Sequence, residues 1–230
     1  MKIAGLQKMT LLDYPKTVAC IVFLPGCNFR CPYCHNTPLV LSPTEGIDEN
    51  EVFAFLEKRR GILEGVVISG GEPTLSHELP FFMAKIKELG YRVKLDTNGT
   101  SPTLLKAIVD AGLVDYVAMD VKHAPHRYQD VVRGDVMPLE AVAESIRFLL
   151  DRHVAYEFRT TLVKGLHSEA DMADIAQWIR GADAFYLQNF KDSGAIMSPE
   201  GLSSFSGEEM ARFLAIAQAY VPCACLRASS

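Results

Sequence analysis

Three cysteines lie close together in the short segment 25-PGCNFRCPYCHN-36, at the spacing Cys27-x3-Cys31-x2-Cys34. Cysteine thiolates bind zinc and hold iron–sulfur clusters, and closed sites of both kinds usually take four protein ligands. Three thiols can instead hold three corners of a cubane cluster and leave one iron open to a ligand from outside the protein. We therefore interpret residues 25–36 as a cluster loop whose last ligand is a substrate or a cofactor.

Two other uses of these thiols stay open from the residues alone. A zinc site needs a fourth ligand, which could be the adjacent His35 or the distant Cys223 and Cys225. A thioredoxin-like redox pair would use 31-CPYC-34 at the start of a helix, and this alternative leaves Cys27 without a role.

The length of 230 residues indicates one globular domain over residues 1–230. The formal net charge is −5 and no long run of either sign occurs, so the chain lacks the basic footprint of a nucleic-acid or membrane-surface binder. The apolar run 18–25 is too short to span a bilayer and fits a signal peptide poorly. We expect a cytoplasmic protein in which the clustered cysteines bind metal or do chemistry. Cys20, Cys223 and Cys225 are interpreted as structural.

Hydrophobic periodicity predicts strands and helices in alternation. The predicted strands are 17–24, 65–70, 91–96, 114–121, 154–163 and 183–190. The predicted helices are about 48–60, 77–89, 102–111, 138–151, 169–180 and 207–219, with Ser168 and Ser206 as capping residues. This order predicts an α/β fold with a parallel sheet, and it has too few units for a complete eight-stranded barrel. An open doubly wound sheet or a partial barrel over about 17–190 fits. An extra strand or hairpin is expected at 3–15, and a helix and tail at 207–230.

Polar residues follow four consecutive predicted strands. The cysteine loop follows the first strand, 69-SGGEPT-74 the second, 96-DTNG-99 the third and 120-DVK-122 the fourth. Because the carboxyl ends of parallel strands meet at one edge of the sheet, all four segments should face the same site.

Each of the later segments also has a plainer interpretation. Gly-Gly-Glu-Pro and Asn-Gly are common turn sequences. Asp120 and Lys122 lie two residues apart and share one face of a strand. Since unpaired buried charge is unfavourable, they would pair with each other or with Asp96.

The cysteine spacing, with Tyr33 before the third cysteine and Gly-Gly-Glu-Pro at 70–73, resembles the radical S-adenosylmethionine (SAM) superfamily. The resemblance implies a partial (β/α)6 TIM-like barrel of the radical SAM type and a [4Fe–4S] cluster whose open iron binds SAM. It also implies reductive cleavage of SAM to methionine and a 5′-deoxyadenosyl radical, which abstracts a hydrogen atom.

The resemblance assigns roles to residues of this sequence. Cys27, Cys31 and Cys34 would be the metal ligands and the catalytic centre. The cofactor contacts would be Tyr33, His35, Gly70, Gly71, Glu72, Asp96, Thr97, Asn98, Asp120, Lys122, Arg159 and Gln188. Among these, the Gly-Gly-Glu-Pro segment would bind the SAM amino group, and Lys122 would meet the SAM carboxylate. Gln188 stands near the place where related activases often carry a histidine, so the chain departs from the activase pattern there.

Four segments together resemble glycyl-radical enzyme activases. They are the N-terminal segment 5–27, which has Leu-Asp-Tyr-Pro at 12–15, and residues 27–36, 96–99 and 120–122. The likeness is greatest to activating proteins of anaerobic ribonucleoside-triphosphate reductase. It implies a large glycyl-radical protein as substrate, and flavodoxin or ferredoxin as electron donor, because no second cluster is evident. Two alternatives are a radical SAM enzyme acting on a small molecule or peptide, and a non-catalytic iron or zinc module.

Overall fold

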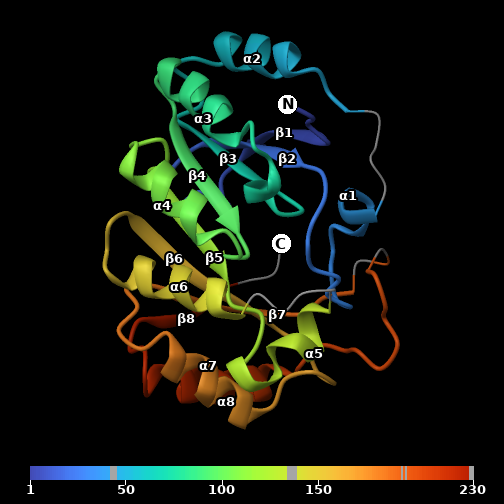
Figure 1. The fold of residues 1–230 in the computed structure, drawn as a ribbon. Coiled ribbons are helices and arrows are strands. Elements are labelled where there is room, and N and C mark those ends of the chain that lie inside the picture. Colours follow the sequence, from blue (N-terminus) through green and yellow to red (C-terminus); the bar gives the residue numbers. More distant parts are fainter. Residues whose placement is uncertain (42–45, 134–138, 193, 195, 228–230) are drawn as a thin grey trace.

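A computed structural model describes residues 1–41, 46–133, 139–192, 194 and 196–227 of the chain. Within these ranges the strands form one eight-stranded sheet in chain order (Figure 1). They are β1 (Gly5–Thr10), β2 (Ala19–Leu24), β3 (Gly65–Gly70), β4 (Arg92–Thr97), β5 (Tyr116–Asp120), β6 (Ala155–Leu162), β7 (Phe185–Asn189) and β8 (Ala224–Arg227). β1 pairs antiparallel with β2, and every later pair is parallel. The predicted α/β fold, with an extra strand before the parallel sheet, is confirmed.

The parallel sheet has one strand more than the six of the predicted partial barrel. β8 covers only 224-ACLR-227 and pairs with β7. Its short sequence carries few β-branched residues, so its pattern was too weak to place it in the barrel. Of the tail expected up to residue 230, residues 228–230 lie outside the described part of the chain.

The longer helices begin and end close to the predicted positions. They are α2 (Glu49–Lys58), α3 (Leu79–Glu88), α4 (Pro102–Asp110), α6 (Leu139–Leu150), α7 (Glu169–Trp178) and α8 (Gly207–Gln218). Ser168 and Ser206 each form a capping box, with Asp171 and Glu209 respectively. The short α1 (Thr37–Leu41) and α5 (Tyr128–Val132) were not predicted. No helix in the described ranges is long and apolar enough to cross a membrane.

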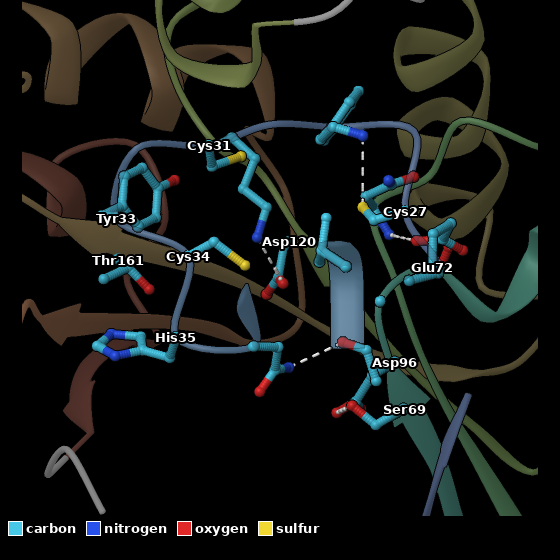
Figure 2. Close-up of a pocket in the computed structure, with 18 of the residues that line it drawn as sticks. Cys27, Cys31, Tyr33, Cys34, His35, Ser69, Glu72, Asp96, Asp120 and Thr161 are labelled. Atoms are coloured by element: carbon cyan, nitrogen blue, oxygen red, sulfur yellow. Dashed lines mark hydrogen bonds and ion pairs between the residues drawn. The ribbon is translucent and has the colours of Figure 1, made fainter. Parts of the chain in front are cut away.

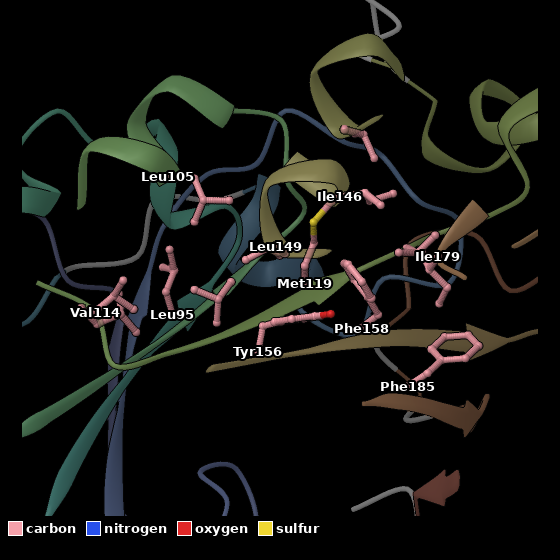
Figure 3. Close-up of a cluster of buried hydrophobic side chains, with 14 of the residues drawn as sticks. Leu95, Leu105, Val114, Met119, Ile146, Leu149, Tyr156, Phe158, Ile179 and Phe185 are labelled. Atoms are coloured by element: carbon pink, nitrogen blue, oxygen red, sulfur yellow. The ribbon is translucent and has the colours of Figure 1, made fainter. Parts of the chain in front are cut away.

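The sheet curves, and the helices lie around its outer side (Figure 1). Alternate strand residues point outward and form the main core with the helices. Figure 3 shows Leu95, Met119 and Phe158 from neighbouring strands beside Ile146 and Leu149 of α6, and all five are buried. The residues between them, such as Asp96 and Arg159, therefore point to the inner side of the curve, where the strand ends meet.

Candidate active site

The three cysteines of the loop after β2 line one pocket (Figure 2). The amide of Phe29 donates to Cys27 Sγ at 3.4 Å, and the Cys34 amide donates to the Cys31 carbonyl at 3.1 Å. All three thiols are free. Burial raises the pKa of Cys31 to about 12, and burial is also the main reason why the pKa of Cys27 is raised. Thiols in this state need a positive partner, such as a metal, to become thiolates.

The donor set fits a cubane cluster in the chemistry of its ligands. Three free thiols share one pocket, although no group of three or more His, Cys, Asp or Glu side chains in the described ranges is placed to hold a metal ion. The Tyr33 hydroxyl, which belongs to a lining residue, is buried without a hydrogen-bond partner in the described structure. His35 lines the pocket with its ring 5.8 Å from that of Phe190. An unsatisfied buried hydroxyl beside free thiols is consistent with a bound group.

The turn after β3 is held against the cysteine loop by backbone contacts. The Gly71 amide donates to the Leu24 carbonyl at 3.0 Å, and the Glu72 amide donates to the Gly26 carbonyl at 2.8 Å. A Cβ on Gly70 would lie 2.3 Å from the Leu24 oxygen, and one on Gly71 would lie 1.8 Å from the Gly26 oxygen. Both positions therefore need glycine because the two backbones touch.

The carboxylate of Glu72 ties two of the strand-end turns together. It is buried and accepts hydrogen bonds from the amide and hydroxyl of Thr74 at 3.1 and 2.6 Å. It also accepts from the Thr97 hydroxyl at 2.8 Å and the Asn98 amide at 2.6 Å. Burial raises the pKa of Glu72, and these hydrogen bonds oppose that effect. The Gly-Gly-Glu-Pro and Asp-Thr-Asn-Gly turns therefore form one unit.

The Asp-Thr-Asn-Gly turn also reaches the cysteine loop. Asn98 Nδ2 donates to Asn28 Oδ1 at 2.8 Å, and Asn28 Nδ2 donates to the Thr100 hydroxyl at 2.9 Å. Gly99 has a positive φ of 76°, as an Asn-Gly turn requires. The cysteine loop thus has direct polar contact with both neighbouring turns.

Five charged side chains form an alternating row across the inner side of β4, β5 and β6. Lys94 Nζ contacts Asp96 Oδ1, and Arg159 Nη1 lies 3.4 Å from Asp96 Oδ2. Arg159 Nε lies 2.9 Å from Asp120 Oδ1, and Lys122 Nζ lies 2.9 Å from Asp120 Oδ2. The pairing of Asp120 with Lys122 that the sequence allowed is therefore present, and Arg159 joins it to Asp96.

Ion pairing keeps Asp96, Asp120 and Lys122 of the row charged. Burial by itself raises the pKa of Asp96 and of Asp120, but Arg159 and the neighbouring lysines outweigh burial and hold both below the usual range. Burial lowers the pKa of Lys122, and Asp120 is the first of several groups that raise it well above its ordinary value. Three cations and two anions leave a net positive row at the pocket. Such a row can receive a carboxylate.

Every residue that the sequence predicted for the site lines this one pocket. The lining includes Cys27, Cys31, Tyr33, Cys34, His35, Gly70, Gly71, Glu72, Asp96, Thr97, Asn98, Asp120, Lys122, Arg159 and Gln188. Sequence reasoning missed Thr161 of the lining and Lys94 behind it. Their signal was strand alternation, because Lys94 precedes Asp96 by two residues and Thr161 follows Arg159 by two.

Comparisons with known proteins identify the family to which the chain belongs. The profile of the Radical SAM superfamily matches residues 21–179. A provisionally named glycyl-radical enzyme activating enzyme of Methanocaldococcus jannaschii is 36% identical over 200 residues, which cover 84% of this chain and 81% of that protein. A pyruvate formate-lyase-activating enzyme of Staphylococcus aureus is 29% identical over 178 residues, which cover 71% of this chain and 69% of the enzyme.

A solved structure shows the same fold. SuiB of Streptococcus suis, bound to S-adenosylmethionine, matches with a TM-score of 0.66 at 13% identity, over 91% of this chain and 52% of that one. Radical SAM enzymes use a [4Fe–4S] cluster and SAM as cofactors. On the matched profile and the archaeal relative, the chain is an enzyme that belongs to the radical SAM superfamily.

Proposed function

We propose that this enzyme activates a glycyl-radical protein, by abstracting a hydrogen atom from the Cα of a glycine in that partner. The observation that carries the proposal is the single pocket in which three free thiols face the charged row. The similarity to activating enzymes over most of the chain supports a protein substrate. The favoured partner is anaerobic ribonucleoside-triphosphate reductase, because the N-terminal segment with 12-LDYP-15 resembles the activating proteins of that enzyme.

The cofactors would be held by residues that the pocket brings together. Cys27, Cys31 and Cys34 would ligate three irons of the cluster. When bound, the reduced cluster with SAM supplies a 5′-deoxyadenosyl radical and methionine. Lys122, already charged and paired with Asp120, would meet the SAM carboxylate. The Gly-Gly-Glu-Pro turn would orient the SAM amino group.

The shape of the sheet supports a polypeptide substrate. Within the described residues, β1 and β8 are the two ends of the sheet order, so the barrel is not closed by strand pairing. An open side gives room for a loop of a large protein. A single cluster would need an external reductant, for which we propose flavodoxin or ferredoxin. Free cysteines fit a reducing compartment, and we propose the cytoplasm.

The test combines the reconstituted, reduced protein with SAM and an anaerobic ribonucleotide reductase under anaerobic conditions. Electron paramagnetic resonance (EPR) should show a glycyl-radical doublet, and 5′-deoxyadenosine should form in the same tube. Both should vanish with Cys31→Ala. The exposed Cys225, outside the pocket, gives the matched control, because Cys225→Ala should leave both signals unchanged.

The two readouts separate the parts of the proposal. Deoxyadenosine without a doublet would show that the protein cleaves SAM but that its substrate is another protein, a small molecule or a peptide. If a protein that carries an intact cluster gives neither the doublet nor deoxyadenosine, the proposed function is refuted.

A further inference from the structure

Lys94 is buried on the inner side of the sheet, directly behind the charged face of the pocket. Only 1% of the residue is exposed, and it lies on β4 two residues before Asp96. Its register partners are Val67 on β3 and Tyr116 on β5, so its stem passes between apolar and aromatic neighbours. An ammonium group in such surroundings is unfavourable unless it is paired. Among the residues that the structure describes, its ion-pair partner is Asp96.

Lys94 and Arg159 divide the two oxygens of Asp96 between them. Lys94 Nζ donates to Oδ1, while the Ser69 hydroxyl at 3.1 Å and Arg159 Nη1 at 3.4 Å donate to Oδ2. Because each oxygen has its own donor, the carboxylate is held in one orientation. Arg159 then keeps its shorter contact, 2.9 Å from its Nε, for Asp120.

Removal of Lys94 would change this division. Asp96 would lose the donor on Oδ1 and would compete more strongly for the Arg159 guanidinium, which now binds Asp120 at the shorter distance. Asp120 in turn holds Lys122 Nζ at 2.9 Å. The row would also fall from net positive to neutral, because it would keep two cations and two anions. Lys94 is therefore coupled to the pocket through Asp96, although it does not line the pocket.

We propose that Lys94 is a positioning residue for SAM: its buried ammonium fixes Asp96, and through Arg159 and Asp120 it sets the row that receives the SAM carboxylate. The proposal rests on the proposed SAM site. It assigns to Lys94 a role in cofactor affinity and none in cluster binding, because Lys94 makes no described contact with the cysteine loop.

The experiment measures SAM affinity of the anaerobically reconstituted protein by EPR titration, with iron and sulfide content and the thermal midpoint recorded on the same samples. Lys94→Ala should retain the cluster and raise the Kd for SAM at least about tenfold, as expected for loss of one charge-assisted contact. Propylammonium, which replaces the missing atoms and the charge, should restore affinity. Propanol, of similar shape but neutral, should not restore it.

Two further variants keep the test decisive. Lys94→Met fills the same space without charge and should lose affinity for SAM to the same degree. It also provides the test if Lys94→Ala is too unstable to take up its cluster. Lys87 is a half-buried lysine whose Nζ pairs with Asp115 at 2.7 Å, outside the pocket. Lys87→Ala should leave the Kd for SAM unchanged.

The outcomes for Lys94 and for the proposed function are distinct. If wild-type protein binds SAM and Lys94→Met binds it equally well, the positioning role is wrong and the proposed function stands. Equal rescue by propanol and propylammonium would also overturn it, because packing alone would then explain the loss. If wild-type protein carries its cluster but does not bind SAM, the proposed function itself fails.

Discussion

Gly71 lies so close to Gly26 that a Cβ on Gly71 would stand 1.8 Å from the Gly26 carbonyl oxygen. The adjacent Glu72 amide donates to the same oxygen at 2.8 Å. Gly26 immediately precedes the first of the three cysteines of the site. The turn after β3 therefore sets the backbone position of the cysteine loop, in addition to any contact it makes with a cofactor.

Gly71→Ala should separate the two backbones. The Cβ cannot be accommodated without moving the Glu72–Gly26 contact, so we expect a loss of about 3 kcal/mol in unfolding free energy and a reduced iron content after reconstitution. Chemical denaturation and iron analysis measure the two effects. A matched control is Gly207→Ala at the start of α8, where an added Cβ would meet nothing within 4 Å. A Gly71→Ala variant as stable and as iron-loaded as wild type would contradict this account.

The sequence allowed the site to be predicted better than the way it is held together. Motif spacing placed Cys27, Asp96 and Lys122 at strand ends, and a parallel sheet necessarily brings strand ends to one edge. The partners of Glu72 could not be predicted, because they depend on how the turns approach one another in space. Lys94 was overlooked since a single lysine in an apolar strand resembles an edge residue until the curvature of the sheet buries it.

The fold likewise could be predicted where local patterns are clear and could not where contacts distant in sequence decide the structure. Long segments with clear periodicity, such as α6 and β6, were predicted with nearly the correct bounds. The five-residue α1 and α5 and the four-residue β8 were missed or left uncertain. Elements this short contain too few residues to show a period, and contacts distant in sequence stabilise them.

The cysteines should divide into two functional groups. Replacing Cys27, Cys31 or Cys34 with Ala should abolish cluster binding and SAM cleavage together, because each would remove one of three ligands. Cys20→Ala and Cys223→Ala should keep the cluster, since neither residue lines the pocket. Iron and sulfide analysis with EPR of the reduced protein measures the difference. An intact cubane in all three loop variants would show that the ligand assignment is wrong.

Glu72→Gln should destabilise the site even though it preserves shape. Each carboxylate oxygen accepts from a backbone amide, Oε1 from Thr74 and Oε2 from Asn98. Either orientation of a glutamine amide would place its NH2 against one of these N–H groups. We expect a loss of about 2 kcal/mol or more in unfolding free energy, measured by denaturant titration. Glu140→Gln, on an exposed side chain of α6, should change stability little. Equal stability of the two variants would argue against a stabilising role for the hydrogen bonds that the buried Glu72 carboxylate accepts.

His167 should make stability depend on pH. Its Nδ1 accepts from the Val163 amide at 3.2 Å and its Nε2 donates to the Lys122 carbonyl at 3.0 Å, so the folded protein holds the neutral ring. Burial, followed by the stacked His123, lowers its pKa to about 4. Above pH 6.5 the ring is neutral in both states and has no effect. As the pH falls from 6.5 towards 4, the ring takes up a proton in the unfolded chain but not in the folded chain, so the free energy of unfolding decreases.

Between pH 7 and pH 5 this single group should lower the unfolding free energy by about 2 kcal/mol. Urea titrations at both pH values measure the change, and the same comparison in His167→Gln removes the contribution of this ring. Nearby His123 and Asp171 remain in the variant, so the difference between the two proteins isolates His167. Equal pH dependence in wild type and variant would mean that His167 is protonated in the folded protein, and its hydrogen bonds to Val163 and Lys122 would then need to be reassigned.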